Sequence, residues 1–221
     1  MQEVTLHATA KASLKNLKQK MLCMMLFVKR IYGLEHPLVN LLLSKYMLTN
    51  QKDIQLTKNN EGRCAIIADI VTPLGDINIG TTHLDVFDRT GAVRLKQIDT
   101  LGMALNKIWA DGKYSAQVLV GDMNALKKDE IGELWLKRIN AANSARGFTT
   151  TFTEIPLLES YGFADSFEHM NSAPPAITTW AGRRVDYIFS RKNTTLMPHG
   201  CYVYHSSASD HLAILCDFVK S

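Results

Sequence analysis

A chain of 221 residues is long enough to bury the core of one large domain, so we interpret residues 1–221 as a single domain. With 46% hydrophobic and 21% charged residues, the composition is that of a globular protein and excludes an intrinsically disordered one. The formal net charge of +4 suits a polyanionic substrate but is too small to identify one.

The chain opens with a basic stretch. Between Glu3 and Glu35 there is no acidic residue, while six Lys or Arg occur. A transit peptide has this composition, but a lysine-rich surface helix over residues 8–21 explains it equally well, and we favour the helix. The longest apolar run, MLCMMLFV at 21–28, is far too short to cross a bilayer, so we expect no transmembrane segment.

Strands and helices are mixed along the rest of the chain. Residues 64–71 and 76–84 predict two adjacent strands, because both are apolar and the TPLGD between them supplies Pro and Gly for a turn. From Leu95 to Trp109 apolar residues recur at steps of three and four, which predicts one buried helix face. The run AQVLV at 116–120 predicts a short strand that ends at Gly121.

The remaining elements are two helices and two strands. The expected helices are 133–142 and 155–161, and the expected strands are 183–189 and 212–218. Strands therefore come in pairs and also alternate with helices, which argues against a purely parallel, doubly wound sheet. Two packed sheets flanked by helices fit this order better.

The number and spacing of the cysteines give weaker evidence, which concerns the redox state of the thiols and the location of the protein. The four cysteines, at 23, 64, 201 and 216, show no CxxC or zinc-like spacing, so we interpret them as reduced thiols of an intracellular protein. With no secretory signal either, the cytosol or the nucleus is favoured.

Polar clusters stand at the ends or edges of four expected strands. They are Thr82-His83-Leu84-Asp85, Gly121-Asp122-Met123-Asn124, Asp186 within RRVDYIF, and Asp210-His211 before LAILCDF. One such cluster has a bland explanation, since a lone His at a strand end is more often structural, and Gly, Asp and Asn are turn formers. Four clusters on one scaffold instead indicate side chains that converge on a cleft. An Asp inside an apolar strand needs a partner, and a His is the natural one.

In this order, the segments QEV (2–4), TTHLD (81–85), GDMNA (121–125), RRVDYIF (183–189) and SDHLAI (209–214) resemble the signatures of the endonuclease/exonuclease/phosphatase superfamily. LLLSKYMLT (41–49), YGFADSF (161–167), Arg94 and Gln97 are also similar to that pattern. The resemblance spans nearly the whole chain, and its last three segments together are highly specific.

The resemblance implies an α+β fold, a four-layer α/β/β/α sandwich of two mixed β-sheets like that of deoxyribonuclease I, with one cleft across the sheet ends. It also implies a divalent cation, usually Mg²⁺ with Mn²⁺ as an alternative, and hydrolysis of a phosphate ester by in-line attack of water. The implied metal ligands are Glu3 and Asp210.

The same resemblance assigns the other roles. His211, held by Asp186, activates the attacking water or stabilises charge on the phosphoryl group. Asp122 positions that water, Asn124 holds a phosphate oxygen or the nucleophile, and His83 donates to a non-bridging oxygen.

Neighbouring residues are open to two interpretations. Arg183 and Arg184 could contact a substrate phosphate or be solvated loop charges, and we weigh the two equally. Trp180 could stack on a base or fill the loop, and we favour the filling role. Asp85 is expected to brace the turn after His83 and not to bind metal.

The chain also departs from the family pattern. The family's strands before QEV carry an Asn, and this chain starts at Met1-Gln2-Glu3, so we expect an N-terminally truncated member; Asn40 could match the family's GNA. A catalytically impaired, truncated member that binds a phosphorylated ligand without turnover is therefore the alternative to an active enzyme. For the substrate, the basic charge favours nucleic acid, with a lipid headgroup or a small phosphoester as alternatives.

Overall fold

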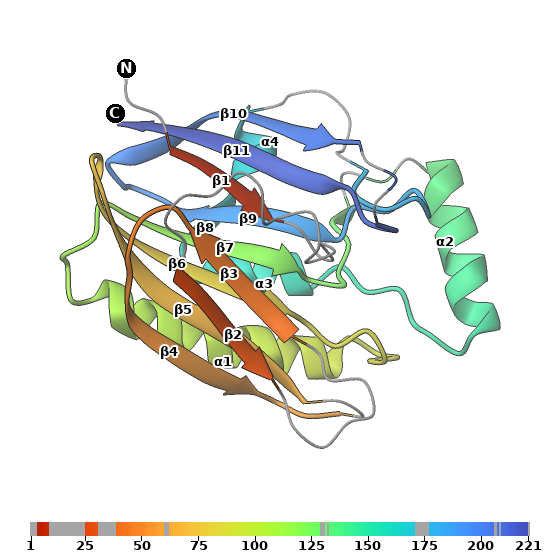
Figure 1. Ribbon diagram of the computed structural model, residues 1–221. Coiled ribbons are helices and arrows are strands. Elements are labelled where there is room, and N and C mark those ends of the chain that lie inside the picture. The colour runs from red at the N-terminus through yellow and green to blue at the C-terminus, as the bar shows by residue number, and fades with distance from the viewer. Residues whose placement is uncertain are drawn as a thin grey trace.

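The computed structural model describes residues 4–8, 25–30, 39–59, 62–128, 131, 133–170, 177–205, 207 and 209–220. Figure 1 shows two layers of strands with helices against them. The strands are β1 (Val4–Ala8), β2 (Met25–Arg30), β3 (Val39–Ser44), β4 (Leu48–Leu56), β5 (Arg63–Thr72), β6 (Gly75–His83), β7 (Ala116–Asp122), β8 (Phe163–Asp165), β9 (Asp186–Arg191), β10 (Leu196–Tyr204) and β11 (Ala213–Lys220). The helices are α1 (Ala92–Trp109), α2 (Glu133–Ala145), α3 (Glu154–Ser160) and α4 (Ser166–Met170).

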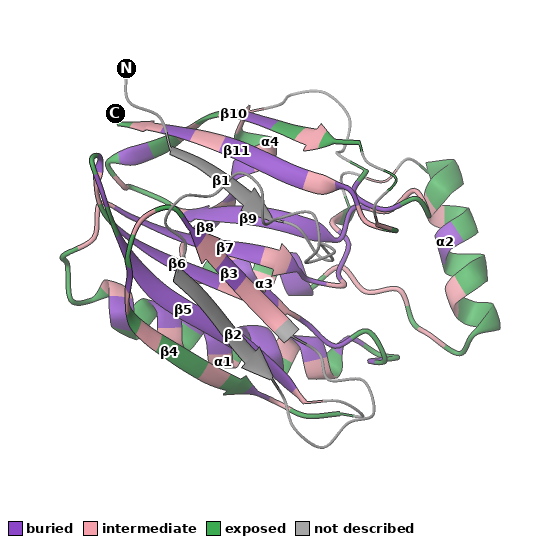
Figure 2. Cartoon of the chain, in the orientation of Figure 1, coloured by how far each residue is buried: buried purple, intermediate pink, exposed green. Residues whose placement is uncertain are grey.

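Six strands form the main sheet in the order β4-β5-β6-β7-β9-β8. The β6 and β7 strands are parallel, with α1 as their crossover, and the other neighbours are antiparallel. The main sheet is therefore mixed. Its central strands β5, β7 and β9 are almost wholly buried (Figure 2), which explains why their sequences are nearly continuous apolar runs.

Helices α1 and α3 cover one face of this sheet. Ile98, Leu101 and Leu105 of α1 pack in one apolar cluster with Leu119 and Phe189 of the strands. These α1 residues recur at steps of three and four, so the amphipathic pattern seen in the sequence is the packing face of the helix.

The opposite face of the main sheet packs against a second layer of strands. One part of that layer is the antiparallel sheet β1-β11-β10, whose Ile214 and Phe218 share a core with Val118 and Ile188. The other part is the antiparallel pair β2-β3, from which Leu42 packs on Ile70 of β5 and its neighbours. Because strand residues alternate between the two faces, both cores lie on the same side of the main sheet.

The expected sandwich of two facing sheets is thus confirmed. Among the described strands only the main sheet is mixed, while the second layer is antiparallel throughout. The described helix that packs on the second-layer core is the short α4, through Phe167 and Met170. The helix expected over residues 8–21 lies outside the described residues apart from Ala8, which ends β1.

Most boundaries are close to the expected ones, with two corrections. The β7 strand continues through Gly121 to Asp122, because Gly121 pairs with both neighbouring strands. The strand expected over 183–189 begins only at Asp186, as β9, so Arg183 and Arg184 belong to the loop before it. Strands β4 and β10 were not expected. The exposed, polar side of β4 and the Pro and Gly within β10 hide their strand character.

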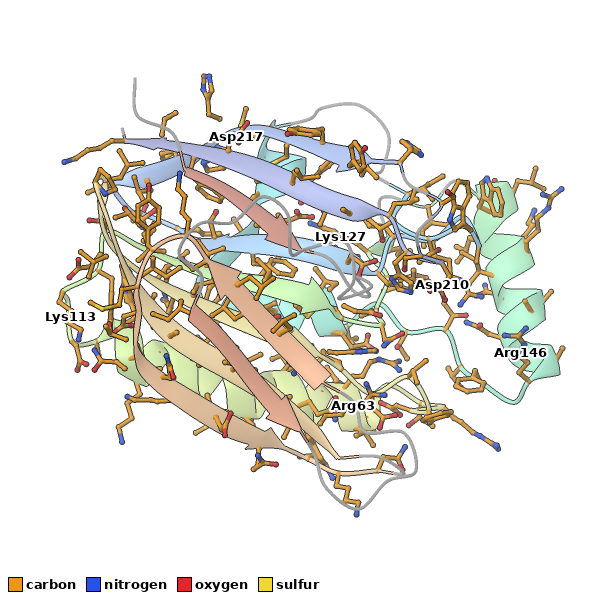
Figure 3. All side chains as sticks on the ribbon, in the orientation of Figure 1. Arg63, Lys113, Lys127, Arg146, Asp210 and Asp217 are labelled. Carbon is orange, nitrogen blue, oxygen red and sulfur yellow. A yellow bond between two sulfur atoms is a disulfide. The ribbon has the colours of Figure 1, made fainter. Side chains whose placement is uncertain are left out.

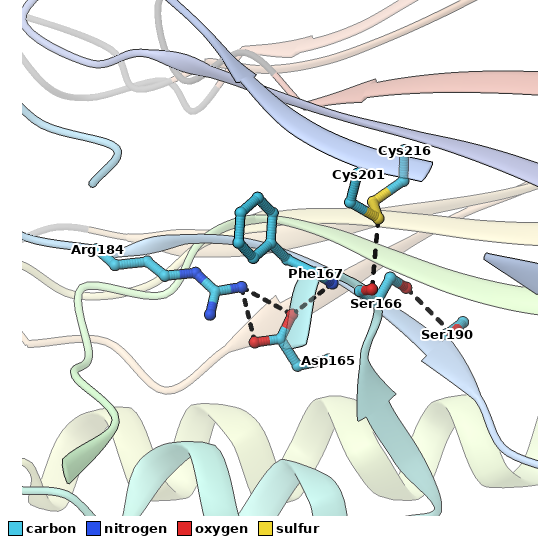
Figure 4. The surroundings of a disulfide bond; sticks show 7 residues. All are labelled: Asp165, Ser166, Phe167, Arg184, Ser190, Cys201 and Cys216. Atoms are coloured by element: carbon cyan, nitrogen blue, oxygen red, sulfur yellow. Dashed lines mark hydrogen bonds and ion pairs between the residues drawn. A yellow bond between two sulfur atoms is a disulfide. The ribbon is translucent and has the colours of Figure 1, made fainter. Parts of the chain in front are cut away.

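The interpretation of all four cysteines as reduced thiols is wrong for one pair. Cys201 of β10 and Cys216 of β11 are direct cross-strand partners and form a disulfide with a Cα–Cα distance of 4.1 Å (Figure 4). The spacing of 15 residues gave no hint of this, because only the strand register brings the two side chains together. Cys64 is buried, and its sulfur lies 3.6 Å from Asn40 Nδ2. One of the two arguments for a cytosolic or nuclear location is therefore removed.

No helix in the described part of the chain has both the length and the apolar character that a membrane crossing requires.

Candidate active site

Three polar side chains form a row across the middle of the main sheet. In the strand register His83 of β6 is opposite Asp122 of β7, and Asp122 is opposite Asp186 of β9. All three lie on the face that packs against the second layer, since they alternate with the helix-facing residues of the same strands. The row therefore sits between the two layers, at the end where β6 and β7 finish and β9 begins.

Gly121 allows this row to form. Its φ of 148° is a backbone conformation that other residues rarely adopt. A Cβ at this position would stand 1.9 Å from the Thr82 carbonyl oxygen, so only a glycine lets β7 approach β6 closely enough here. Asp122 follows directly and takes its direction from this close approach.

The second layer completes the site with His211, which lies two residues before β11. Its Nδ1 lies 2.8 Å from Asp186 Oδ2. This hydrogen bond is the largest cause of a raised pKa of His211. Because a carboxylate can only accept, Nδ1 carries the proton, and in the neutral ring Nε2 keeps its lone pair. The expected Asp186–His211 pair is thus present in the structure.

Thr178 links the two members of this pair. Its buried hydroxyl accepts hydrogen bonds from the backbone N–H groups of Val185 (3.1 Å) and Asp186 (3.2 Å). Its carbonyl accepts from the N–H of Leu212 at 2.7 Å, the residue after His211. One threonine therefore fixes the start of β9 and the start of β11 relative to each other.

Asp122 lies between the two histidines. Its Oδ2 is 3.4 Å from His83 Nε2 and 4.0 Å from His211 Nδ1, while Oδ1 accepts from the backbone N–H of Asn124 at 2.8 Å. Burial, and secondarily the negative charge of Asp186, raises the pKa of Asp122 to about 7. At neutral pH this carboxylate is therefore poised between its two protonation states.

Asn124 turns the chain out of the site with a left-handed φ of 45°. Its side-chain Nδ2 donates to the Leu84 carbonyl at 3.0 Å, which ties the loop after β7 to the loop after β6. One N–H of the amide and its Oδ1 remain for a ligand.

Contacts from α1 hold the loop that follows His83 in place. Asp85 is buried, and its backbone N–H donates to Gln97 Oε1 at 3.0 Å. Arg94 Nη1 donates to the carbonyl of Asp85 at 3.2 Å, and the same guanidinium pairs with buried Glu154 at 2.9 Å. The backbone of Asp85 is thus tied to α1 through both its N–H and its carbonyl, while a bracing role of the Asp85 side chain stays a prediction.

Of the two expected metal ligands, Asp210 lies outside the described group formed by Asp122, Asp186 and His211. Asp210 is exposed at the rim of the site, where its Oδ1 accepts from Ser209 Oγ at 3.4 Å (Figure 3). Glu3 lies outside the described residues. The carboxylates and the imidazole that lie closest together are those of Asp122, Asp186 and His211, whose ligand atoms are all within 4.8 Å of one another.

The two arginines before β9 have different surroundings. Arg184 is buried, its Nη2 lies 2.7 Å from Asp165 Oδ2, and Phe167 lies beside it (Figure 4). Its guanidinium lies 5.1 Å from the ring centre of Phe167 and 4.5 Å from that of Tyr187. These contacts give it a structural role. Arg183 is only half-buried and reaches the loop surface, so it is the better placed of the two for a substrate phosphate.

Trp180 does not fill the loop. Its side chain is 62% exposed, which corrects the interpretation of this residue as a packing element. Its loop is held by hydrogen bonds to the neighbouring segment instead, so the ring is not needed to close a gap.

Two site residues escaped the sequence analysis. Arg63 is buried at the start of β5, and its positive charge partly opposes the rise in the pKa of Asp122. A charged pair at the mouth of an apolar strand was the signal that identified Asp210 and His211, and it applies equally to Arg63. Thr178 carries no such signal, because it belongs to an ordinary Thr-Thr pair in a loop.

Comparisons with known proteins identify the family and the fold. A sequence model of the Endonuclease/Exonuclease/phosphatase family matches residues 1–211. A search of curated protein sequences finds no match to the chain.

Several solved structures share the fold at low identity. The human Nocturnin catalytic domain, solved with bound sulfate, has 20% identity and a TM-score of 0.63, over 90% of this chain and 72% of that one. ANGEL2, described as a 2′,3′-cyclic phosphatase, has 16% identity and a TM-score of 0.63, over 88% of this chain and 74% of that one. A humanized TDP2 from D. rerio has 18% identity and a TM-score of 0.64, over 99% of this chain and 85% of that one.

Proposed function

The chain belongs to the endonuclease/exonuclease/phosphatase family, a family of phosphoester hydrolases, and on that premise we propose that it hydrolyses a phosphodiester with the help of a divalent cation. The observation that carries the proposal is the His211–Asp186 hydrogen bond of 2.8 Å beside the buried carboxylate of Asp122. Four side chains from four separate segments converge here, an arrangement that packing alone does not require.

The residues present fit a divalent cation. Two neighbouring carboxylates, Asp122 and Asp186, are buried. Burial, and next the negative charge of Asp186, raises the pKa of Asp122, and a bound cation would offset both effects. Oxygen donors are the ligands that Mg²⁺ prefers, and it needs only one or two protein carboxylates. Asp122 is the buried candidate ligand. Asp210, the ligand that the resemblance implies, is exposed outside the Asp122–Asp186–His211 group and stays a proposed second oxygen donor. Mg²⁺ is the proposed ion and Mn²⁺ the alternative.

Such an ion supplies positive charge that neutralises the phosphate and the leaving oxygen. The remaining work belongs to the protein's own groups. His211 accepts the proton of the attacking water at Nε2, and Asp186 holds the ring in the tautomer that makes this possible. The raised pKa of His211 makes the imidazole a stronger base.

At the other end of the row, His83 and Asn124 can donate hydrogen bonds to the phosphate oxygens on which charge develops. His83 presents an N–H beside Asp122, and the remaining N–H of Asn124 is available for a non-bridging oxygen. Both side chains are half-buried, so water competes with these contacts less than it would on an open surface. Arg183 is the proposed contact for a substrate phosphate outside the reacting centre.

The test is hydrolysis of an aryl phosphodiester, followed by nitrophenolate release, with added Mg²⁺ or Mn²⁺ against excess EDTA. We expect turnover that requires the metal and that falls at least a hundredfold in His211→Ala, the order of magnitude of a lost general base. His199→Ala is the matched control, since His199 lies on β10 with an exposed side chain and should keep full activity. Turnover that survives both EDTA and His211→Ala would refute the proposal.

Binding without turnover is the alternative that the same assay excludes or supports. The intact hydrogen bond between His211 and Asp186 argues for an enzyme, because a pure binding site has no need of an oriented base. Absence of turnover on phosphodiester, phosphomonoester and polynucleotide substrates alike would favour the binding role.

A further inference from the structure

Trp180 is fixed at the rim of the active site with its ring exposed. Its indole Nε1 donates to the Ser209 carbonyl at 2.9 Å, and its backbone N–H donates to the Asp210 carbonyl at 3.2 Å. The preceding residue, Thr179, pairs with His211. The one polar group of the indole, its N–H, is therefore bonded to the loop that carries His211, while Trp180 remains 62% exposed.

Two arginines lie close together beside this loop. The guanidinium of Arg183 is half-buried and reaches Asn143 Oδ1 of α2 at 3.5 Å. Burial, and next the positive charge of Arg146, lowers the pKa of Arg183. Among the described residues, neither arginine forms an ion pair with a carboxylate. The backbone N–H of Arg146 donates to the carbonyl of the same Asn143 at 2.9 Å, so both arginines stand at the C-terminal end of α2. Two guanidinium groups that form no ion pair with a described carboxylate can receive an anion, and their N–H donors suit a phosphate.

Helix α2 extends the same surface with a second exposed ring. Trp135 packs on the backbone at Gly182, where its ring lies 3.2 Å from the position of a Cβ, and it stays half-exposed. Arg138 lies over this ring at 5.5 Å. Figure 3 shows α2, with Arg146, at the same end of the molecule as Asp210, whereas Lys113 is at the opposite end.

We propose that this Trp–Arg face, formed by Trp180, Arg183, Arg146 and Trp135, binds single-stranded nucleic acid as the substrate. One base stacks on the exposed indole of Trp180, and the adjoining backbone phosphate lies between Arg183 and Arg146. The next phosphate then reaches His211. This inference rests on the proposed hydrolysis and names its substrate.

Stacking on a fixed aromatic ring next to cationic side chains is how proteins bind single strands without reading sequence. A duplex fits less well, because its bases are already stacked on one another. An anionic membrane is the competing partner, since exposed Trp and Arg also suit a lipid surface. The structure favours the single strand, because the indole N–H of Trp180, the polar group that an interfacial Trp keeps at the headgroup level, is already bonded to the Ser209 carbonyl.

The test measures binding to the His211→Ala protein, which does not consume the probe. A fluorescein-labelled oligothymidylate, an abasic strand of the same length and a duplex are compared by anisotropy, and vesicles with anionic lipid are compared by flotation. We expect the oligothymidylate to bind on the order of tenfold more tightly than the abasic strand, and Trp180→Ala to remove this difference. Trp180→Phe, which keeps a ring, should retain most of it.

The arginines are tested by salt. Each of Arg183→Gln and Arg146→Gln should lower the slope of log affinity against log salt concentration by about 0.7, the value for one phosphate contact on a single strand. Tyr204→Ala and Lys113→Gln are the matched controls, an exposed ring of β10 and a lysine at the far end of the molecule, and both should bind like the parent protein.

The outcomes separate this inference from the proposed function. Metal-dependent hydrolysis of the aryl phosphodiester without a Trp180-dependent preference for bases would overturn the single-strand substrate and leave the hydrolase intact. Tight, Trp180-dependent binding without any turnover would overturn the proposed hydrolysis and leave the Trp–Arg face as a site that binds single strands without cleaving them. Equal affinity for duplex and single strand, or vesicle binding that Trp180→Ala abolishes while no strand binds, would also overturn the inference.

Discussion

Thr178 shows how one buried hydroxyl governs the alignment of two catalytic groups. Replacing it by valine keeps the shape but leaves the N–H groups of Val185 and Asp186 without their acceptor, at a cost of about 1 to 3 kcal/mol each. We predict that Thr178→Val lowers kcat by about tenfold or more, with little change in KM, because Asp186 and His211 shift relative to each other.

Thr178→Ser is the matched control for this prediction, since it restores the hydroxyl and should recover most of kcat. A steady-state comparison of the two variants decides the matter. If valine lowers only the thermal stability and leaves kcat unchanged, Thr178 is structural and has no part in aligning the site.

Asp122 carries a cost in stability that its function explains. Its pKa in the folded chain, about 7, is above the unfolded value of 3.8, so the folded state resists ionisation of this group. The penalty is absent below the unfolded pKa, grows as the pH rises between the two values and is complete above pH 7. Asp122→Asn should therefore be more stable than the parent by roughly 1 to 4 kcal/mol at about pH 8 in EDTA, and no more stable at about pH 4.

Urea unfolding at the two pH values measures this difference. Asp76→Asn, at an exposed position of β6, is the control and should show no such pH dependence. Equal stabilisation of Asp122→Asn at both pH values would mean that burial of the charge is not the cause.

At the scale of elements, the row His83–Asp122–Asp186 depends on the close approach of β6 and β7. Gly121→Ala would place a methyl group against the Thr82 carbonyl and force a φ that alanine rarely adopts. We predict a loss of about 1 to 3 kcal/mol in the free energy of unfolding, together with reduced activity, because Asp122 moves with the strand.

Gly200→Ala is the appropriate comparison, since a Cβ there meets nothing within 4 Å and the residue also lies in a strand. Thermal denaturation and the phosphodiester assay should leave that variant close to the parent. Normal stability and activity in Gly121→Ala would show that the two strands need not approach so closely.

Elements with strong periodicity could be predicted from the sequence. The spacing of Leu101 and Leu105 identified α1, and the apolar runs identified β5, β7 and β11, because burial on both faces leaves a continuous apolar pattern. The edge strand β4 and the Pro- and Gly-containing β10 were missed, since their patterns reflect exposure and irregular pairing. The β-sheet register, which opposes Asp122 to Asp186, could not be derived from one strand alone.

The candidate site was predicted in part for the same reason. Each polar residue at a strand end could be recognised by its contrast with the apolar run beside it, as for Asp186 and His211. The contact of His83 with Asp122 depends on parallel pairing between strands separated by α1, which the sequence does not encode locally. The exposure of Trp180 depends on tertiary packing in the same way.

At the scale of the whole molecule, the second layer is closed by the disulfide between β10 and β11. A bridge across a 15-residue separation restricts the unfolded chain and is worth about 3 kcal/mol in a chain-entropy estimate. We therefore predict that a reductant lowers the denaturation midpoint of the parent protein. Cys201→Ala/Cys216→Ala should show the lower midpoint with or without reductant. A midpoint that ignores reductant in the parent protein would mean that the bridge does not stabilise the fold.

Both layers contribute to catalysis in this account, because Asp186 belongs to the main sheet and His211 to the second layer. Neither layer alone holds the oriented base. The geometry of the site therefore depends on how the two layers pack, and Asp186 and His211, which are distant in sequence, act together.

A double-mutant cycle on kcat/KM tests that claim most directly. It compares the parent protein, Asp186→Asn, His211→Ala and the double variant in the metal-dependent phosphodiester assay. If Asp186 acts through His211, the double variant should be no slower than His211→Ala alone, since the orienting group has nothing left to orient. Losses that simply multiply would contradict the account and show that the two residues act independently.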